Sequence, residues 1–340
     1  MGTFTVIATG RLHPQALAVL KQHCELKYWD QEEAIPQALL YEWLVEADGI
    51  YNSGFTPINA ALLQQGAKLR VVSQPSAGYD NIDAAACTAR GVRIGNTPGA
   101  LTETTADLAF ALLLTAARRI TQGWDMVRQG NWKKKTTIPF GIDLYGKTLG
   151  IVGMGAIGTA VARRARACGM NIIYHNRKPR SGAEYTSMRW VSFGELLGQS
   201  DCIVVLTPLT EQTRHMFDAA AFAKMKPTAY FVNAARGAIV DTAALYEALA
   251  DQRIAYAALD VTDPEPLPAD HPLLQLPNIL ITPHVGSATP ETRLRMAMMA
   301  VDNLLAGLRK QPLLKTPTRQ RRLAPALPGY SRLLRRKACV

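Results

Sequence analysis

Cysteine is scarce in this sequence of 340 residues, which contains five. They are Cys24, Cys87, Cys168, Cys202 and Cys339, and no two of them form a C-x-x-C pair. This scatter argues against a disulfide framework and against a zinc site built on paired cysteines. It favours a reducing compartment, and we therefore expect a cytoplasmic protein that holds no metal.

Long apolar runs are also missing. The most apolar stretch, Leu108 to Ala117, is shorter than the roughly 20 residues that a membrane-spanning helix needs. Arg118 and Arg119 follow it directly. The first residues carry neither the charged start nor the apolar core of a signal peptide. We expect a soluble protein without a membrane partner.

Acidic residues are absent from positions 311–340, although this segment is rich in cations. The cations are Lys315, Arg319, Arg321, Arg322, Arg332, Arg335, Arg336 and Lys337. They account for most of the net charge of +11, so the rest of the chain is nearly neutral. A basic segment can contact nucleic acid, but Tyr330 is the only aromatic residue here that could stack on bases. We expect a flexible basic tail over residues 313–340 and no nucleic-acid partner.

What the sequence does contain is a regular alternation of strand-like and helix-like runs. The strand-like runs near the start cover residues 3–8, 26–29, 49–52 and 69–73, and the helix-like runs cover 14–22, 36–46 and 57–65. A long apolar helix is expected from Thr102, a second alternating unit over 148–283, and a closing helix over 291–308. The pattern predicts an α/β protein with two doubly wound parallel-sheet domains.

A glycine-rich fingerprint opens the second unit. A short apolar strand runs into Gly153, Gly155 and Gly158, and a helix-like segment follows. The first glycine allows a tight turn, the second lets the backbone approach a pyrophosphate, and the third lets helix pack on strand. The N-terminus of the helix faces the anion. The spacing therefore predicts a dinucleotide site.

The position of this fingerprint in mid-chain predicts that one domain interrupts the other. We expect a flavodoxin-like substrate domain from residues 1–100 and 285–312. A Rossmann cofactor domain, residues 101–284, is expected to be inserted in it.

The end of the second strand of this unit indicates which dinucleotide binds. An NAD site usually carries an acidic residue there, for the adenine ribose hydroxyls. Here the chain has no acid and offers Arg177, Lys178 and Arg180 instead. Cations attract a 2′-phosphate, so we expect NADPH to be preferred and NADH to be weaker.

Three polar residues follow apolar runs that are typical of buried strands: Arg236, Glu265 and His284. In open parallel sheets, ligands bind at the carboxyl ends of the strands. An arginine, a carboxylate and a histidine at that edge can bind an anionic substrate, orient an imidazole and move a proton. A loop over residues 74–81 has the composition of a small anion nest of backbone N–H groups, although it could also be an ordinary connection.

Together these motifs resemble the D-isomer-specific 2-hydroxyacid dehydrogenases over residues 3–310. The motifs are Gly153-x-Gly-x-x-Gly, Asn233-x-x-Arg-Gly, Asp260-Val-x-x-x-Glu-Pro and Pro283-His-x-Gly-Ser. Residues 76–81 and 260–274 are similar to the glyoxylate/hydroxypyruvate reductase branch, with 2-ketogluconate reductases close by. The resemblance implies two domains with a cleft between them, and a homodimer built mainly on the cofactor domain.

The resemblance also implies roles for individual residues. Arg236 would bind the substrate carboxylate, and Ala77 and Gly78 would offer backbone donors. His284 would be the acid/base, with Glu265 as the partner that stabilises its imidazolium. Ser287 is expected at the substrate. The residues expected at the cofactor, besides those above, are Ala156, Ile157, Asn176, Thr207, Pro208, Thr213, Ala234, Ala235, Asp260 and Gly286.

The expected reaction is the NADPH-dependent reduction of small 2-oxo acids, glyoxylate and hydroxypyruvate, to glycolate and D-glycerate. A 2-ketogluconate reductase is the first alternative, because loops that the sequence does not position decide the pocket volume. A corepressor-type nucleotide sensor is the second, since corepressors similar to this family keep the same arginine, glutamate and histidine. The basic turn at 177–180 favours the enzyme.

Overall fold

The computed structural model describes residues 3–54, 56–133, 137 and 140–317. It divides into two compact units. Unit 1 combines Met1–Ala100 with Arg293–Val340, and unit 2 is the continuous segment Leu101–Thr292. The second boundary lies after the expected position, residue 284. Residues 285–292 stay with unit 2, where the amides of Val285 and Gly286 donate to the Asp260 carboxylate at 2.8 Å each.

The sheet of unit 1 has the strand order β2-β1-β3-β4-β5, and every pair in it is parallel. This is the order of flavodoxin-like folds. Its strands are β1 (Phe4–Ala8), β2 (Cys24–Tyr28), β3 (Gly49–Tyr51), β4 (Val71–Ser73) and β5 (Arg93–Gly95). Its helices are α1 (Pro14–His23), α2 (Gln37–Leu44), α3 (Ala60–Gln65), α4 (Ala84–Ala89) and α11 (Pro290–Leu308).

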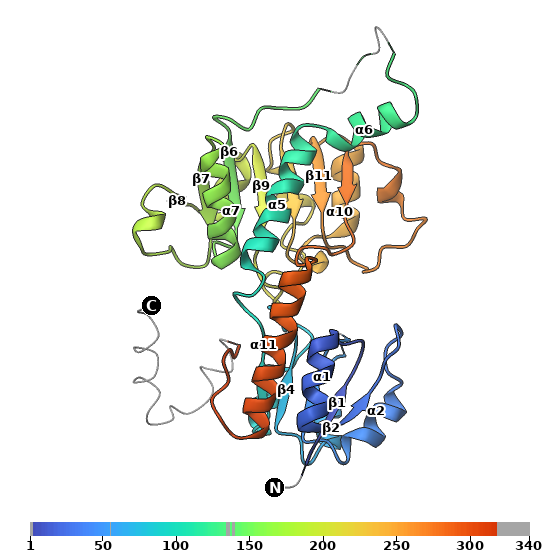
Figure 1. Cartoon of the computed structure of the whole chain (residues 1–340). Coiled ribbons are helices and arrows are strands. Elements are labelled where there is room, and N and C mark those ends of the chain that lie inside the picture. The colour runs from blue at the N-terminus through green and yellow to red at the C-terminus, as the bar shows by residue number, and fades with distance from the viewer. Residues whose placement is uncertain (1–2, 55, 134–136, 138–139, 318–340) are drawn as a thin grey trace. The chain divides into compact units, whose positions relative to one another are not determined.

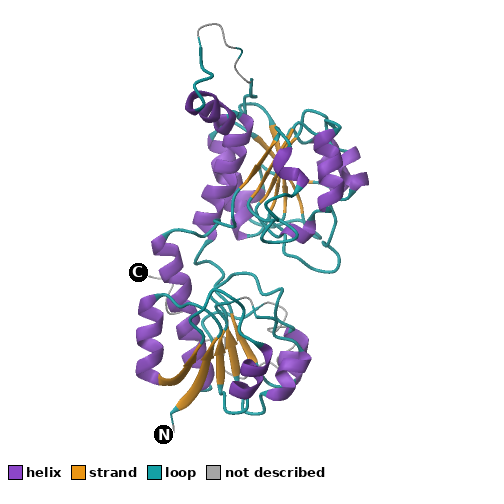
Figure 2. Ribbon diagram, turned by 90° about the vertical axis from the view of Figure 1, so that its right-hand side faces the viewer, coloured by secondary structure: helices purple, strands orange, loops and turns teal. Residues whose placement is uncertain are grey.

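Helices cover both faces of this sheet, as Figure 2 shows. Successive side chains of a strand point to opposite faces. Ile7 accordingly packs with Leu44 of α2 and Leu62 of α3, while Val6 packs with residues of α1 and α11. The strands are therefore apolar on both sides, which is typical of a buried parallel sheet.

The sheet of unit 2 has the order β12-β11-β10-β9-β6-β7-β8 and is also parallel throughout. Its strands are β6 (Thr148–Val152), β7 (Asn171–His175), β8 (Arg189–Trp190), β9 (Cys202–Val205), β10 (Tyr230–Asn233), β11 (Tyr256–Leu259) and β12 (Ile279–Ile281). Its α-helices are α5 (Thr102–Ala117), α6 (Ile120–Arg128), α7 (Ala156–Ala167), α8 (Phe193–Gln199), α9 (Ala219–Ala223) and α10 (Thr242–Ala250). Short 3-10 helices occupy Ala183–Tyr185, Gly237–Ile239 and Pro272–Gln275.

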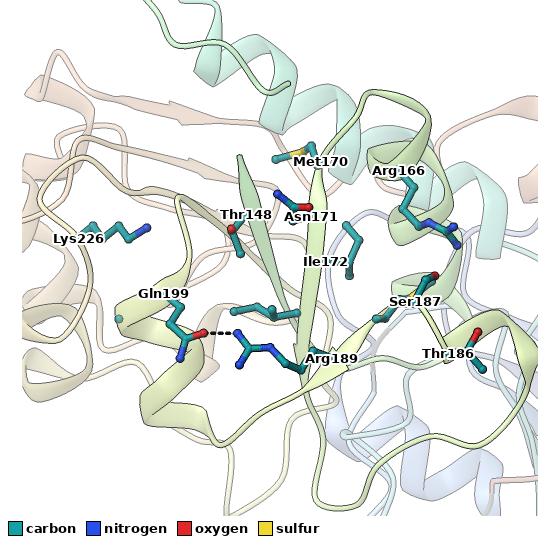
Figure 3. Close-up of a pocket in the computed structure, with 13 residues that line it drawn as sticks. Thr148, Arg166, Met170, Asn171, Ile172, Thr186, Ser187, Arg189, Gln199 and Lys226 are labelled. Atoms are coloured by element: carbon teal, nitrogen blue, oxygen red, sulfur yellow. Dashed lines mark hydrogen bonds between the residues drawn. The ribbon is translucent and has the colours of Figure 1, made fainter. Parts of the chain in front are cut away.

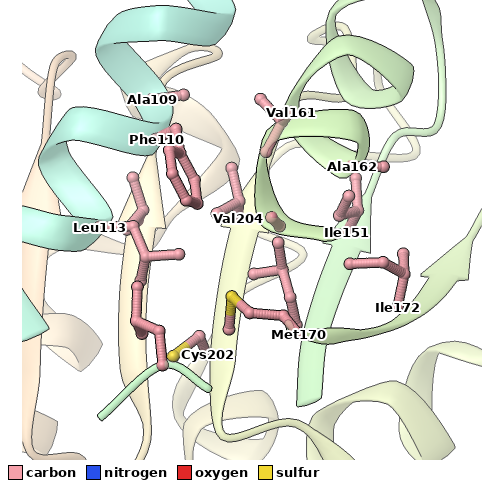
Figure 4. Close-up of a cluster of buried hydrophobic side chains, with 14 of the residues drawn as sticks. Ala109, Phe110, Leu113, Ile151, Val161, Ala162, Met170, Ile172, Cys202 and Val204 are labelled. Atoms are coloured by element: carbon pink, nitrogen blue, oxygen red, sulfur yellow. The ribbon is translucent and has the colours of Figure 1, made fainter. Parts of the chain in front are cut away.

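Two apolar layers hold this sheet in place. On one face, Phe110 and Leu113 of α5 and Val161 of α7 pack over Ile151 and Val204 of the strands (Figure 4). On the other face, α8, α9 and α10 bury a second cluster. The fully buried side chains of β6 and β9 explain why the strand ends of unit 2 are rigid supports for polar loops.

The start of the expected flexible tail is instead packed on unit 1. Leu313 is buried, and the Lys315 amide donates to Oδ1 of Asn303 at 3.0 Å. The prediction that the tail leaves the fold at residue 313 is therefore wrong for residues 313–317. Residues 318–340 lie outside the described residues. In the described part of the chain, no helix combines the length and the apolar character needed to cross a membrane.

Candidate active site

The carboxyl edge of the sheet in unit 2 collects all the site residues that the sequence predicts in that unit. Its strands are parallel, so the loops after β6, β7, β9, β10, β11 and β12 leave from the same edge (Figure 1). The strand order reverses between β6 and β9, where β6 has β7 on its other side. In open α/β sheets, such a switch point opens a crevice for a ligand.

The glycine turn after β6 is shaped by two close approaches and one open position. Gly153 has φ +104°, and a Cβ there would lie 2.5 Å from the Thr207 amide nitrogen. A Cβ on Gly158 would lie 2.4 Å from the Gly153 carbonyl oxygen. A Cβ on Gly155, by contrast, would meet nothing within 4 Å. The fold requires the first and last glycines, whereas the middle one leaves room above the turn.

Helix α7 begins at this turn without a side-chain cap, since its N-cap residue is Gly155. The exposed backbone at Ala156, the first residue of the helix, therefore offers an N–H group and the positive end of the helix dipole to an anion. The Gly155 N–H is already used, since it donates to the Gly153 carbonyl at 2.8 Å. Asn176, directly after β7, fixes the turn from the side. Its Oδ1 accepts from the Met154 amide at 2.8 Å, and its Nδ2 donates to the Met154 carbonyl at 3.2 Å.

The basic residues after β7 are exposed, and one of them is held in place by a ring. Arg177, Lys178 and Arg180 all lie at the surface. The Arg180 guanidinium lies 5.5 Å from the ring centroid of Tyr185. The Tyr185 hydroxyl is in turn 3.0 Å from Oγ1 of Thr159 in the first turn of α7. This chain of contacts ties Arg180 to the helix that starts at the glycine turn.

The turn after β10 directs Arg236. Nδ2 of Asn233 donates to the Arg236 carbonyl at 2.9 Å, and Oδ1 of Asn233 accepts from the Ala235 amide at 3.1 Å. Asn233 is buried, so its amide is a fixed support for the turn. Gly237 follows, where a Cβ would lie 1.8 Å from the Thr262 carbonyl oxygen. The Arg236 turn therefore lies directly against the loop that carries Glu265.

His284 and Glu265 form a pair. Nδ1 of His284 donates to Oε1 of Glu265 at 2.6 Å, with about two fifths of each side chain exposed (37% and 40%). The histidine has φ +52°, an uncommon conformation for a residue with a side chain. Asp260 maintains this conformation, because its carbonyl accepts from the His284 amide at 2.9 Å. Its carboxylate accepts from Oγ1 of Thr282 at 2.7 Å, besides the Val285 and Gly286 amides.

The charge of Glu265 is stabilised by its neighbours. Burial alone would raise the pKa of the Glu265 carboxyl. The hydrogen bond and charge of His284, with the Thr262 amide and the Arg236 charge, outweigh that effect and bring the pKa below its ordinary value. Arg236, Glu265 and His284 are thus electrostatically coupled through the glutamate.

The remaining predicted residues are distributed over four loops and the first turn of α7. Thr207, Pro208 and Thr213 follow β9, where Oγ1 of Thr213 donates to the Pro208 carbonyl at 2.8 Å. Ala234 and Ala235 belong to the Arg236 turn, while Gly286 and Ser287 follow His284. Ile157 is in the first turn of α7. Ala77 and Gly78 belong to unit 1, in the loop after β4.

A surface hollow of about 1050 Å³ lies elsewhere on unit 2. It is lined by Thr148 and Asn171, the first residues of β6 and β7, and so lies at the amino edge of the sheet (Figure 3). The C-terminal end of α7 lies at the same edge. Arg166 in the last turn of α7 suits the negative end of the helix dipole, which gives this cation a structural explanation. The hollow is not part of the candidate site.

Sequence reasoning missed the residues that support the predicted ones. Asn233 and Gly237 could be recognised as parts of a sequence motif. Their contacts with the Arg236 turn and with the loop that carries Glu265 could not be predicted from it. Asp260 was expected to line the cofactor, whereas its carboxylate accepts three hydrogen bonds from the His284 loop and the residue is buried. Nothing in the sequence indicated a role for Tyr185, because the contact between its ring and the Arg180 guanidinium forms only when the chain folds.

Comparisons with known proteins identify the family. The model of the family described as D-isomer specific 2-hydroxyacid dehydrogenase, NAD binding domain, matches residues 110–286. A glyoxylate reductase of Korarchaeum cryptofilum is 44% identical over 304 residues, covering 88% of this chain and 92% of the relative. A glyoxylate reductase/hydroxypyruvate reductase of Homo sapiens is 42% identical over 315 residues, covering 91% and 96%.

One solved structure is similar over nearly the whole chain. It is an NADPH-dependent glyoxylate/hydroxypyruvate reductase of Sinorhizobium meliloti, in complex with NADP and malonate. The TM-score is 0.86 at 32% identity, covering 96% of this chain and 100% of that chain. This similarity confirms the fold class that the sequence predicts.

Proposed function

Because the chain belongs to the D-isomer-specific 2-hydroxyacid dehydrogenase family and is an NAD(P)-dependent oxidoreductase, we propose that it is an NADPH-preferring reductase of small 2-oxo acids. Its substrates are glyoxylate and hydroxypyruvate, and its products are glycolate and D-glycerate. The observation that carries this proposal is the hydrogen bond of 2.6 Å between His284 and Glu265 at the carboxyl edge of a dinucleotide-binding sheet.

His284 is the general acid. Glu265 accepts from Nδ1, so the carboxylate both orients the ring and stabilises its protonated form. The other ring nitrogen, Nε2, then gives its proton to the carbonyl oxygen of the substrate. In the reverse direction the neutral ring takes the hydroxyl proton. The lowered pKa of Glu265 favours its charged form, which is the form that accepts from Nδ1.

Arg236 binds the carboxylate of the substrate. A guanidinium is planar and can donate two parallel hydrogen bonds to a carboxylate. The Asn233 amide fixes the turn from which this side chain leaves. Binding the carboxylate in one orientation fixes the carbonyl group beside it, which supports proton transfer from His284 to one defined oxygen.

The glycine turn fits a dinucleotide. Gly155 leaves open space where any side chain would project, and α7 starts there without a side-chain cap. We assign the pyrophosphate to this turn, and the adenine end to Asn176 and the basic residues that follow. The bound cofactor supplies the hydride that reduces the carbonyl carbon. Arg177, Lys178 and Arg180 favour NADPH over NADH, because they offer positive charge to a 2′-phosphate.

The active form is a homodimer. Helix α6 exposes Ile120, Trp124 and Val127 at 54%, 63% and 48%, and none of its residues is buried. Their spacing brings the three side chains to one face of the helix. An exposed apolar face of this kind is typical of a protein–protein contact, and a second copy of this chain is the proposed occupant. Analytical ultracentrifugation of the wild type and of Trp124→Lys tests the proposal, because only the variant should sediment as a monomer.

Initial rates with a panel of 2-oxo acids, each with NADPH and with NADH, test the proposed activity. We expect glyoxylate and hydroxypyruvate to be reduced faster with NADPH. A higher kcat/KM for 2-ketogluconate would favour the first alternative. Tight NADPH binding with no turnover of any 2-oxo acid would favour the nucleotide sensor and contradict the proposal.

A further inference from the structure

The basic turn after β7, residues 176–180, is hydrogen-bonded at both of its ends. At its start, Nε1 of Trp190 donates to the Asn176 carbonyl at 2.9 Å. At its end, the Arg180 amide donates to the hydroxyl of Tyr174, also at 2.9 Å. The backbone of the turn is therefore held at its first and its last residue, while the residues between them project from it.

The residues between these two contacts include Arg177 and Lys178, and both are exposed. In the part of the chain that the structure describes, neither forms an ion pair with an acidic side chain. Pro179 follows them, and its ring fixes its own φ. Two cations on a backbone that is restrained in this way are suited to a phosphate group, because their charges need little rearrangement to meet it.

The hydroxyl of Tyr174 contributes more to the turn than to the core. The ring is almost fully buried and lies 6.4 Å from the ring of Tyr185, measured between centroids. A phenylalanine would bury the same ring. Arg180, which donates to the hydroxyl, is an exposed residue, so water can accept from its amide instead. The net effect of this hydrogen bond on stability is therefore small, whereas its effect on the path of the turn is direct.

Trp190 acts on the other end from the neighbouring strand. It is the aligned partner of Tyr174 where β7 and β8 pair, and β8 is the edge strand of the sheet. The residue is 42% exposed, so burial of the indole explains only part of its presence. Its N–H holds the carbonyl of Asn176, whose side chain is bonded to Met154 of the glycine turn. The basic turn is thus fixed relative to the glycine turn as well.

We propose that Tyr174 and Trp190 are positioning residues, which hold the basic turn in the conformation that receives the 2′-phosphate of NADPH. They act through Arg177 and Lys178 and do not touch the phosphate. A turn without these two hydrogen bonds would lose conformational entropy when the phosphate orders it, and that loss weakens binding. The inference rests on the proposed function, because the 2′-phosphate is the group that distinguishes NADPH from NADH.

The test compares the binding of NADPH and NADH to the full-length protein by calorimetry. Tyr174→Phe and Trp190→Phe each keep an aromatic ring and lose one hydrogen bond to the turn. We expect the Kd of NADPH to rise about tenfold in each variant, which corresponds to ordering the backbone of roughly one more residue. The Kd of NADH should stay the same, since it has no 2′-phosphate. An equal rise for both cofactors, or none for NADPH, would overturn the proposal.

Tyr256→Phe and Trp29→Phe are the matched controls. The buried Tyr256 accepts at its hydroxyl from Nε2 of Gln122 at 3.0 Å. Nε1 of Trp29 donates to the Glu33 carbonyl at 2.8 Å. Each control therefore loses the same kind of hydrogen bond away from the basic turn. The melting temperature can fall in these variants, but the Kd of NADPH should not change. A rise as large as in Tyr174→Phe would reduce the effect to general destabilisation and contradict the positioning role.

A combined variant tests whether Tyr174 acts through the cations. In the background Arg177→Gln with Lys178→Gln, the further change Tyr174→Phe should leave the Kd of NADPH where the double variant has it, because nothing remains to be positioned. A further tenfold rise in that background would show that the tyrosine acts independently of the cations, and would overturn the proposal.

The outcomes separate this inference from the proposed function. A wild type that prefers NADPH, with variants that bind it equally well, would overturn the positioning role alone. A wild type that binds both cofactors equally would overturn the NADPH preference and the positioning role together. A wild type that prefers NADPH but reduces no 2-oxo acid would overturn the proposed activity. In that case weaker NADPH binding by Tyr174→Phe and Trp190→Phe would still support the positioning role.

Discussion

Nδ1 of His284 lies 2.6 Å from Oε1 of Glu265, and the two residues come from loops that follow neighbouring strands of one parallel sheet. The glutamate carries the negative charge of the pair, because its neighbours lower its pKa in spite of burial. A charged acceptor on one nitrogen leaves the other nitrogen to exchange protons with a ligand. This arrangement is what the proposed acid–base role of His284 requires.

Replacing Glu265 by Gln should move the pH profile of reduction. Glutamine can still accept a hydrogen bond from Nδ1, but it removes the negative charge beside the ring. We expect the decline of kcat/KM for glyoxylate at high pH to begin at a lower pH than in the wild type. Stopped-flow rates over a pH series measure this shift. An identical profile in both proteins would remove Glu265 from its proposed role.

Replacing Arg236 by Lys should weaken substrate binding and also slow turnover. An ammonium keeps the charge but loses the planar, bidentate match to a carboxylate. We expect kcat/KM for glyoxylate to fall by at least about tenfold, since hydrogen bonds to charged groups contribute about 1.5–3 kcal/mol. The affinity for NADPH should hardly change. Kinetics equal to those of the wild type would exclude Arg236 from the substrate site.

Neutralising Arg177 and Lys178 together should erode the preference for NADPH. Both side chains are exposed, so their replacement by Gln should leave the melting temperature nearly unchanged. The KM for NADPH should rise several-fold and that for NADH should not. The ratio of the two kcat/KM values is the decisive quantity. A wild type that uses NADH equally well would show that the basic turn is only solvated surface.

Two glycines of the same turn should respond differently to alanine. Gly155→Ala adds a methyl group where nothing lies within 4 Å, so the fold should tolerate it while the cofactor is obstructed. Gly158→Ala brings a Cβ to 2.4 Å from the Gly153 carbonyl oxygen and should lower the melting temperature. Fluorescence titration with NADPH should show a loss of affinity in the folded Gly155→Ala protein. Full affinity there would contradict the placement of the pyrophosphate.

Asp201 should make stability depend on pH. Burial raises the pKa of its carboxyl, but the Thr148 amide and Lys226, whose Nζ is 2.9 Å away, outweigh that and lower it. A lowered pKa stabilises the fold above the ordinary pKa of Asp, and this stabilisation is lost as the pH falls through the lowered value. Asp201→Asn should therefore cost about 1 kcal/mol at pH 7, the contribution of one hydrogen bond. In melting curves, the difference should shrink as the pH falls below about 4, the ordinary pKa of Asp.

The sequence was sufficient to predict where the strands of unit 2 end and which polar residues follow them. Apolar runs that end in Arg236, Glu265 and His284 can be recognised, because burial on both faces of a parallel sheet leaves a continuous hydrophobic signal. The glycine spacing also identified the turn after β6, because close approaches of the backbone leave no room for a side chain. Gly153 and Gly158 are required by close approaches within the turn, and Gly155 leaves open space there.

The supporting contacts could not be predicted, because they join residues that are far apart in the chain. Asp260 can hold the His284 loop only because β11 and β12 are neighbours in the sheet. Nδ2 of Asn96, after β5, donates to the Ala77 carbonyl, after β4, at 2.9 Å, because these two strands pair in parallel. The boundary at residue 284 was misplaced for a similar reason. The sequence of residues 285–292 does not indicate that the amides of Val285 and Gly286 donate to the carboxylate of Asp260, which follows another strand.

The return of the chain to unit 1 has a consequence for biosynthesis. Unit 2 is one continuous segment, whereas unit 1 needs α11, whose Val301, Leu304 and Leu308 are buried against strands made at the very start. On the ribosome, the later segment can complete its core while the earlier one still presents an uncovered apolar sheet. The nascent chain therefore carries an aggregation-prone surface for most of its synthesis, and chaperones that recognise such surfaces should bind the first hundred residues until translation passes α11.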